Sequence, residues 1–301
     1  MCTSSRHRPI HGAYHTKNYR LMKICIIGLG LMGGSMAIDL KKRGFTKHII
    51  GVDNNKLHAH TAEKLGLADE ICDLEEGVKK ADLIVLATPA NVSLHLLPKI
   101  LDQVEEQVIT DVGSIKKSIC ERVKSHSKRS QYVAAHPMAG TEHSGPWAAI
   151  PNLFDAKAVI FTEAENSSKE AIEMVSQLYE TLNMPIVYMS ASNHDIHAAY
   201  VSHISHISSF ALALTVLEKE KNEKNIFNLA SGGFDSTVRL AKSSAEMWTP
   251  IFEQNSENIT AVLDNYIQQL QLFKENILQR KTEDLNQMIN KANSIKRVLK
   301  A

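Results

Sequence analysis

The sequence predicts an α/β fold in which a doubly wound parallel sheet is followed by an all-helical C-terminal domain. Between residues 23 and 189, short β-branched runs alternate with segments of helical period, which is typical of βαβ units. After residue 190 no strand-like run follows, and the patterns are helical only. The 301 residues, 44% of them hydrophobic, suffice for about two domains with a sizeable core. We expect domains over residues 22–189 and 190–301, after a polar, disordered lead over residues 1–21.

Seven near-continuous apolar runs are the predicted strands, at residues 24–28, 49–53, 83–88, 108–111, 132–135, 158–162 and 185–189. Such runs are typical of buried strands in a parallel sheet that helices cover on both faces. The predicted helices alternate with these strands, at residues 31–43, 56–65, 92–104, 114–125 and 169–182. This alternation predicts helices on both faces of one sheet.

The C-terminal domain begins with a predicted helix over residues 193–220, whose apolar stripe is formed by Ile196, Tyr200, Ile204, Ile207, Ala211 and Leu214. Gly232 and Gly233 interrupt the pattern, and Asp235 or Ser236 can cap the next helix. Residues 250–280 then show a seam of period 3.5, formed by Ile259, Leu263, Tyr266, Leu270, Phe273 and Ile277. A helix of about 30 residues spans about 45 Å, which exceeds what a small domain covers. We therefore expect a homodimer through these helices; an intramolecular bundle is the alternative.

Net charge and cysteine content restrict the partners. The 34 basic and 33 acidic side chains leave a net charge of +1, so neither nucleic acid nor a membrane surface is an expected partner and the substrate is expected to be small. The four cysteines, Cys2, Cys25, Cys72 and Cys120, form no CxxC pair, which fits neither a zinc knuckle nor a disulfide framework. A cytoplasmic location is the expectation. The apolar residues 24–38 follow a basic start as in a signal peptide, but they contain four glycines and are too short to span a membrane.

A glycine-rich motif lies between the first predicted strand and the first predicted helix. Gly28, Gly30 and Gly33 form GxGxxG, in which the glycines allow a tight turn, close approach to a pyrophosphate and close packing of the helix on the sheet. Leu31 and Met32 begin the helix, whose N-terminal N–H groups favour an anion. The motif in this context predicts a Rossmann-type dinucleotide site.

Two further strand ends complete the predicted cofactor site. Asp53 closes the second strand 20 residues after Gly33, where a carboxylate would bind the adenosine ribose hydroxyls and repel a 2′-phosphate. This position favours NAD over NADP as the cofactor, although Asp53 could instead only cap a turn. Thr88 and Pro89 end another strand at the same expected rim.

The candidate base is His136, which leaves a predicted strand into a loop containing glycine and proline. An imidazole at the rim of the sheet can accept a proton near neutral pH, although a single histidine is more often structural. Ser114 and Lys116, after the neighbouring strand, could build the same pocket. The sequence therefore favours His136 as a general base.

Four histidines on the first C-terminal helix raise the possibility of a metal site, at His194, His197, His203 and His206. At about 100° per residue His197 and His206 fall on opposite sides of the helix, which makes a four-ligand site on one straight helix geometrically poor, so no metal is expected. His203 and His206 share one flank and could face the nucleotide domain across the cleft. Arg239 is a candidate for a bidentate grip on a carboxylate, with an exposed surface arginine as the alternative.

The chain resembles the prephenate dehydrogenase family, which includes arogenate and cyclohexadienyl dehydrogenases. The resemblance covers residues 23 to about 255 and rests on GLGLMGGS (28–35), DVGSIK (111–116), HPMAGTEHSG (136–145), SHISH (202–206) and GGF…TVRLA…EMW (232–248). It implies oxidation of prephenate with NAD or NADP and loss of carbon dioxide, giving 4-hydroxyphenylpyruvate, the precursor of tyrosine. Arogenate as the preferred substrate and a non-catalytic NAD sensor are the alternatives.

The resemblance also assigns roles to single residues. It implies that His136 accepts the proton of the ring hydroxyl and that Ser114 orients that hydroxyl and the imidazole. Arg239 would bind a carboxylate of the substrate, and Glu142 would form part of a polar gate. In all, substrate contacts are implied for five further residues: His203, His206, Arg239, Glu142 and Thr141. Partly protonated histidines are expected to add positive charge for the dianionic substrate.

Two departures from the family's pattern stand out. Phe234-Asp235-Ser236 replaces the usual Phe-Arg-Asp, which puts any ionic network of that arginine and aspartate in doubt. Ser205 replaces the proline that often precedes the second histidine. Neither change removes the proposed base or the carboxylate grip.

Overall fold

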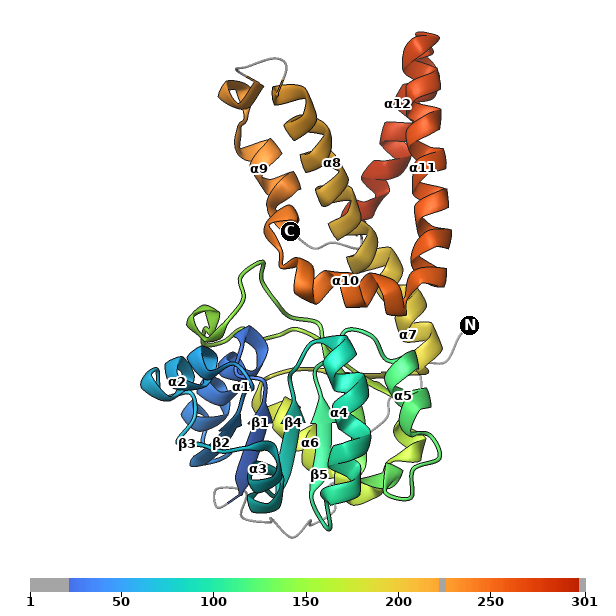
Figure 1. The fold of residues 1–301 in the computed structure, drawn as a ribbon. Helices are drawn as coiled ribbons and strands as arrows, with labels where there is room; N and C mark the ends of the chain where they lie inside the picture. The colour runs from blue at the N-terminus through green and yellow to red at the C-terminus, as the bar shows by residue number, and fades with distance from the viewer. Residues whose placement is uncertain (1–21, 222–225, 298–301) are drawn as a thin grey trace.

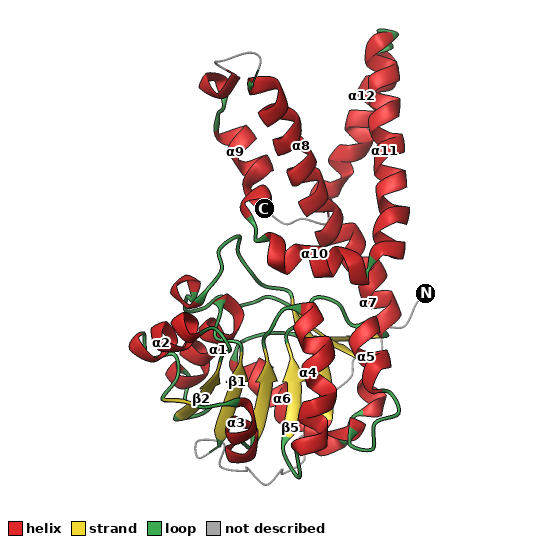
Figure 2. Ribbon diagram, viewed as in Figure 1, coloured by secondary structure: helices red, strands yellow, loops and turns green. Residues whose placement is uncertain are grey.

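The structure is a computed structural model that describes residues 22–221 and 226–297, so the predicted lead over residues 1–21 lies outside the described residues. A sheet with helices on both faces forms the N-terminal half, and helices form the C-terminal half (Figures 1 and 2). The helical half extends away from the carboxyl edge of the sheet, and α10 (Ala245–Gln254) lies between that edge and the long helices (Figure 1). The predicted fold class is therefore confirmed.

The sheet has eight strands in the order β3-β2-β1-β4-β5-β6-β7-β8. Neighbouring strands are parallel except β6 and β7, which are antiparallel. The strands are β1 (Lys23–Ile27), β2 (His48–Val52), β3 (Glu70–Ile71), β4 (Leu83–Leu86), β5 (Val108–Asp111), β6 (Tyr132–Pro137), β7 (Val159–Thr162) and β8 (Ile186–Met189).

Two apolar cores lie on the two faces of this sheet. One core packs the sheet against α1 (Leu31–Lys42), α2 (Lys56–Lys64) and α6 (Lys169–Thr181). The other packs it against α3 (Leu74–Lys80), α4 (Ala90–Gln103) and α5 (Lys117–Val123). Apolar strands covered on both faces are what the continuous runs predicted.

Several details of the predicted sheet were wrong. The two-residue β3 and the short α3 were not predicted, and α5 begins at Lys117 rather than at residue 114. The strand at residues 185–189 is not fully buried: β8 is an edge strand, and Tyr188 is 56% exposed. An apolar run therefore marked a strand but not its place in the sheet.

One continuous helix opens the C-terminal half, formed by α7 (Ala191–Ala198), a π-helical turn (Ala199–His203) and α8 (Ile204–Glu220). It is followed by short helical turns (Ile226–Leu229 and Arg239–Lys242) and by α9 (Gly232–Val238), α10 (Ala245–Gln254), α11 (Ser256–Leu278) and α12 (Thr282–Ala292), with a final turn at Asn293–Arg297. The expectation that Gly232 and Gly233 separate two helices was wrong. The glycines form the first turn of α9 after Ser231, so neither Asp235 nor Ser236 is its cap.

The single helix predicted over residues 250–280 was also wrong, because the chain divides at Asn255 into α10 and α11. The buried Asn255 side chain donates to the backbone oxygen of Asp195 at 2.8 Å, which fixes this corner against α7. The remaining seam of α11 is largely unpacked within one chain. Leu270 is 50% exposed, and Leu214 on α8 is 66% exposed.

The continuous helix Ala191–Glu220 is long and apolar enough to cross a membrane by length and composition, with a mean hydropathy of 1.3 over its most apolar window. Only 11% of that window is buried in the single chain. One such helix is weak evidence for a span. Its exposed apolar surface nevertheless requires an explanation, because soluble proteins rarely leave large apolar patches uncovered.

Candidate active site

The glycine motif forms the turn between β1 and α1. Gly28 has φ +97°, and a Cβ there would lie 2.5 Å from the backbone oxygen of Ala87. A Cβ on Gly33 would lie 2.1 Å from the backbone oxygen of Gly28, so this glycine permits the close packing of α1 on the turn. A Cβ on Gly30 would meet nothing within 4 Å. The chain therefore leaves open space beside Gly30, where a pyrophosphate could approach the backbone.

Asp53 follows β2 and contacts the same turn. One carboxylate oxygen accepts the Leu29 N–H and the other accepts the Asn55 N–H, each at 2.9 Å. Asp53 therefore does cap a turn, and the same hydrogen bonds hold its carboxylate against the glycine loop. Leu31 and Met32 open α1, and the Gly30 N-cap contributes no side-chain hydrogen bond to the helix N-terminus. These features fit a dinucleotide phosphate at that end.

Thr88 and Pro89 lie between β4 and α4. Pro89 is the N-cap of α4, and the Thr88 hydroxyl lies 2.8 Å from the Ser93 hydroxyl. The sheet order places β4 next to β1, so both residues lie beside the glycine loop. The structure therefore brings the predicted cofactor residues to one edge of the sheet.

His136 lies at the end of β6 and is 9% exposed. Its Nδ1 is 2.7 Å from Nε2 of His194, and Nδ1 of His194 is 2.7 Å from Oδ1 of Asp195. His194 and Asp195 come from α7, at the start of the helical half. Sequence reasoning considered His194 only as a metal ligand and missed Asp195, although an adjacent His-Asp pair in the first turns of a helix was visible in the sequence.

Lys116 contacts the end of β6, next to His136. Its buried ammonium contacts Asp111 and donates to the backbone oxygen of Ala135 at 2.7 Å. Asp111 also accepts the Tyr132 hydroxyl at 2.7 Å. This buried ion pair therefore fixes the strand end that carries His136.

Ser114 lies in the bend between β5 and α5, and no hydrogen bond joins its side chain to His136 in the structure. It lies at the strand end next to that of β6, because β5 pairs with β6. Ser114 thus follows a strand that neighbours β6, as predicted, while a pocket shared by Ser114 and His136 stays a prediction.

Burial lowers the pKa of the site histidines. The pKa of His136 is well below its ordinary value because of burial, with added repulsion from His194, Lys116 and His203. Burial lowers the pKa of His203 to about 4 and also lowers that of His206. These shifts disfavour the charged form of each imidazole, which argues against the expectation that partly protonated histidines add positive charge.

His203 and His206 pack against Trp248 of α10. The His206 ring stacks on the indole with centroids 3.5 Å apart, and His203 approaches it edge-on at 6.0 Å. Nδ1 of His203 lies 3.2 Å from the Asn255 amide nitrogen, and its buried Nε2 has no hydrogen-bond partner among the described residues. The two histidines share one flank, as the helical spacing predicted.

Arg239 and Glu142 join the two halves of the molecule. Their side chains form an ion pair of 2.6 Å between the turn after α9 and the loop after β6. Glu142 is largely buried, and its own backbone N–H and then Arg239 lower the pKa of its carboxyl. Arg239 is therefore not an isolated surface arginine. Thr141, next to Glu142, accepts the His143 N–H at 3.2 Å.

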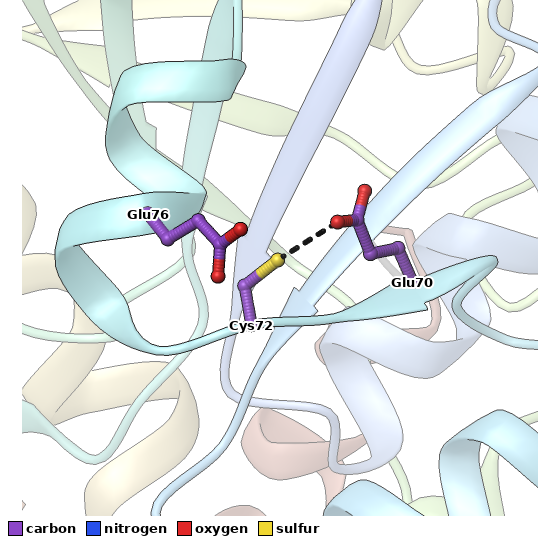
Figure 3. A group of neighbouring side chains, drawn as sticks. All are labelled: Glu70, Cys72 and Glu76. Atoms are coloured by element: carbon purple, nitrogen blue, oxygen red, sulfur yellow. Dashed lines mark hydrogen bonds between the residues drawn. The ribbon is translucent and has the colours of Figure 1, made fainter.

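A group of metal-type donors lies elsewhere, at Glu70, Cys72 and Glu76 (Figure 3). Their donor atoms lie within 4.8 Å of one another, but the Lys80 ammonium contacts Glu70 and lies 2.7 Å from Glu76. A lysine of the protein thus already forms ion pairs with both carboxylates. The cluster lies at the β3 edge of the sheet, remote in the strand order from His136.

Comparison with known proteins gives matches over most of the chain. The family model of the prephenate dehydrogenase nucleotide-binding domain matches residues 36–188, and that of the dimerization domain matches residues 190–291. A prephenate dehydrogenase of Bacillus subtilis is 33% identical over 266 residues, which are 87% of this chain and 72% of that protein. A cyclohexadienyl dehydrogenase of Zymomonas mobilis is 29% identical, covering 83% of this chain and 87% of that one.

Solved structures agree with these matches. The crystal structure of prephenate dehydrogenase from Aquifex aeolicus in complex with hydroxyphenyl propionate and NAD+ superimposes with a TM-score of 0.84 at 30% identity, covering 94% of this chain and 99% of that one. A Synechocystis arogenate dehydrogenase gives a TM-score of 0.72 at 29% identity, covering 92% and 99% of the two chains. The chain belongs to the prephenate dehydrogenase family of oxidoreductases.

Proposed function

We propose that this protein is an NAD-dependent prephenate dehydrogenase that oxidises and decarboxylates prephenate to 4-hydroxyphenylpyruvate. The observation that carries the proposal is the position of His136, a buried neutral imidazole at the same sheet edge as the glycine loop. Strands β1, β4, β5 and β6 are consecutive neighbours, and ligands of open α/β sheets bind at their carboxyl ends.

The residues present fit a dinucleotide. The open space at Gly30, the free helix N-terminus and Asp53 would bind pyrophosphate and ribose, and a carboxylate at this position favours NAD over NADP. When bound, NAD supplies the acceptor for the hydride. Thr88 and Pro89 would line the same site.

His136 then acts as the general base. It takes the proton of the ring hydroxyl while the carbon that bears this hydroxyl loses a hydride. The ring carboxylate leaves as carbon dioxide, and its electron pair completes the aromatic ring. A base that is neutral before the reaction can accept this proton at once, which its lowered pKa ensures.

The remaining predicted residues would bind the substrate. Arg239 would bind a carboxylate of the dianion. For this it would either keep its ion pair with Glu142 and bind both carboxylates, or break that pair. Burial lowers the pKa of His203 and His206 and so disfavours their charged forms. Arg239 is therefore the residue that would supply positive charge to the substrate carboxylate. We assign Ser114, Thr141, His203 and His206 to the pocket, with His203 offering its unpaired Nε2.

The experiment that tests this function follows NADH absorbance with prephenate and with arogenate, each with NAD and with NADP. We expect turnover with prephenate and NAD, and His136→Asn should lower kcat by about 10²–10⁴-fold, the usual contribution of a general base. NAD binding without NADH formation from either substrate would instead identify a non-catalytic sensor.

Arogenate is the second candidate substrate, because similar proteins carry both names. Arogenate has an amino group where prephenate has a keto oxygen, and both molecules keep the ring that His136 would deprotonate. A higher kcat/KM for arogenate than for prephenate would replace the first assignment by this one.

We also propose that two copies of the chain form a homodimer through the C-terminal helices. The family's dimerization domain spans residues 190–291, and α8 and α11 expose apolar rows there in the single chain. Burial against a second copy would explain the apolar surface of the helix Ala191–Glu220 without a membrane. The charge and cysteine content support a cytoplasmic protein without a nucleic-acid partner. Light scattering would give the mass of the assembly.

A further inference from the structure

We propose that His194 and Asp195 are positioning residues that keep His136 in the tautomer whose Nε2 carries no proton. The inference rests on the proposed function, because it concerns the base of that reaction. The chain of contacts is short at both links, 2.7 Å from His136 to His194 and 2.7 Å from His194 to Asp195. All three side chains are buried, with exposures of 9%, 3% and 1%.

The direction of these hydrogen bonds is set at the Asp195 end. Its two carboxylate oxygens accept the backbone N–H groups of Lys116 and Lys117, each at 2.9 Å, at the start of α5. A backbone N–H can only donate, so both oxygens of Asp195 act as acceptors. Nδ1 of His194 must therefore carry the proton that it shares with Asp195.

The proton on Nδ1 of His194 also determines the tautomer of His136. A neutral imidazole carries one N–H, so with Nδ1 of His194 protonated its Nε2 can only accept. His136 Nδ1 must donate to it, and the lone pair of His136 is left on Nε2. Among the described residues, none forms a hydrogen bond with that nitrogen, which leaves it available to a substrate hydroxyl.

The groups around His136 explain why the base needs this support. His194 itself, Lys116 from the β5–α5 loop and His203 from the π-helical turn face it, and all three oppose a positive charge on its ring. Asp111 is held by Lys116, and Asp195 reaches His136 only through His194. When the substrate proton arrives at Nε2 of His136, the bond from Nδ1 to His194 places the Asp195 carboxylate in line with the new cation. A relay of this kind both orients the ring and stabilises its charged form.

Substitutions at His194 separate positioning from simple packing. Glutamine can offer its amide oxygen to the His136 Nδ1–H, whereas phenylalanine fills the space without an acceptor. We expect His194→Phe to lower kcat by about 100-fold, within the range for a base that is misplaced or in the wrong tautomer, with KM for prephenate nearly unchanged. His194→Gln should recover most of this loss.

Ser118→Ala is the matched control. Ser118 lies on α5 and donates to Gln254 of α10 at 2.7 Å, so its loss weakens the same junction of the two halves without touching the relay. Its kcat should equal that of the wild type. Loss of kcat in this control equal to that in His194→Phe would show that junction packing, not the relay, sets the rate.

Tautomers can also be measured without turnover. Long-range ¹H–¹⁵N correlation spectra of the imidazoles distinguish bare from protonated nitrogens, and the His136 signals are those missing from His136→Asn. In the wild-type protein we expect a bare Nε2 and a protonated Nδ1 on His136. In His194→Phe the bare position should shift toward a mixture.

Different results would contradict the proposed function and the proposed role of His194 and Asp195. A protein that forms NADH from neither substrate would overturn the proposed function, while the spectra would still test the tautomer. An active wild-type protein with a protonated Nε2 on His136, or with full kcat in His194→Phe, would overturn the relay alone. If His194→Phe does not fold, His194→Gln and the wild-type spectra decide the matter.

Discussion

Replacing Gly30 by alanine should weaken cofactor binding while leaving the fold intact. Gly30 has φ −76° and ψ −158°, an extended conformation that alanine adopts without strain, and its added Cβ would touch no protein atom within 4 Å. The glycine is therefore not required by the chain itself. Because Gly30 has no side chain, the space outside the turn stays open, and the pyrophosphate would lie there.

The magnitudes follow from these two facts. Relief of unfolded-state entropy by a compatible Gly→Ala change raises the free energy of unfolding by about 0.4–1 kcal/mol, which is roughly 1–4 °C in Tm. In the cofactor site the extra methyl group must be accommodated at a cost of about 1–3 kcal/mol. At 1.4 kcal/mol for each factor of ten, NAD should bind about 5- to 150-fold more weakly.

The assay pairs a thermal melt with titration of NAD by calorimetry. Gly33→Ala is the matched control, because its Cβ would lie 2.1 Å from the Gly28 oxygen and 2.8 Å from the Ile26 side chain. That variant should lose stability as well as binding. A Gly30→Ala protein that binds NAD as tightly as the wild type would refute the placement of the pyrophosphate beside this glycine.

Four other perturbations have expected outcomes. Lys116→Met leaves Asp111 buried without its cation, so the free energy of unfolding should fall by about 3–5 kcal/mol and Tm by roughly 6–20 °C in a thermal melt, whereas an unchanged Tm would contradict the buried pair. Arg239→Ala should raise KM for prephenate by about tenfold or more, through loss of a charge-assisted pair of about 1.5–3 kcal/mol; a constant KM in steady-state kinetics would return Arg239 to a surface role. Because the pKa of His136 lies well below its ordinary value, kcat/KM should stay constant as the pH falls through about 6.5 and decline only in more acidic buffer. The unfolded state binds a proton on this histidine at a higher pH than the folded state does, so the free energy of unfolding should fall from about pH 6.5 downward. If the proposed homodimer forms, Leu270→Glu should convert it into monomers in light scattering, and a persistent dimer would place the interface elsewhere.

The sequence predicted the sheet well because burial on both faces produces continuous apolar runs. It could not predict direction or position: the run at residues 158–162 gives no sign that β7 is antiparallel to β6, and the run at residues 185–189 gives none that β8 is an edge strand. The two-residue β3 is too short to produce a pattern at all. Local patterns therefore determine which segments are strands, whereas tertiary packing determines how they pair.

The site shows the same division. His136, Arg239 and the glycines belong to recognisable local motifs, and in the structure His136 ends β6, the glycines form the β1–α1 turn, and Arg239 pairs with Glu142. The partnership of His136 with His194 could not be predicted, because it joins residues 58 positions apart through the packing of α7 on the sheet domain. The break at Asn255 lies just before the first residue of the seam, Ile259, so the seam could not reveal it, and the break depends on a contact with Asp195 that only the folded chain shows.

The junction between the two halves has an evolutionary consequence. Strand β8 ends at Met189 and α7 begins at Ala191, so the helical half starts almost at once with the histidine and aspartate that contact β6. Recombination at this point would exchange the helical half together with the contacts that it makes to His136. A chimaera made there would need compatible residues on both sides of the crossover, which favours inheritance of the two halves as one unit.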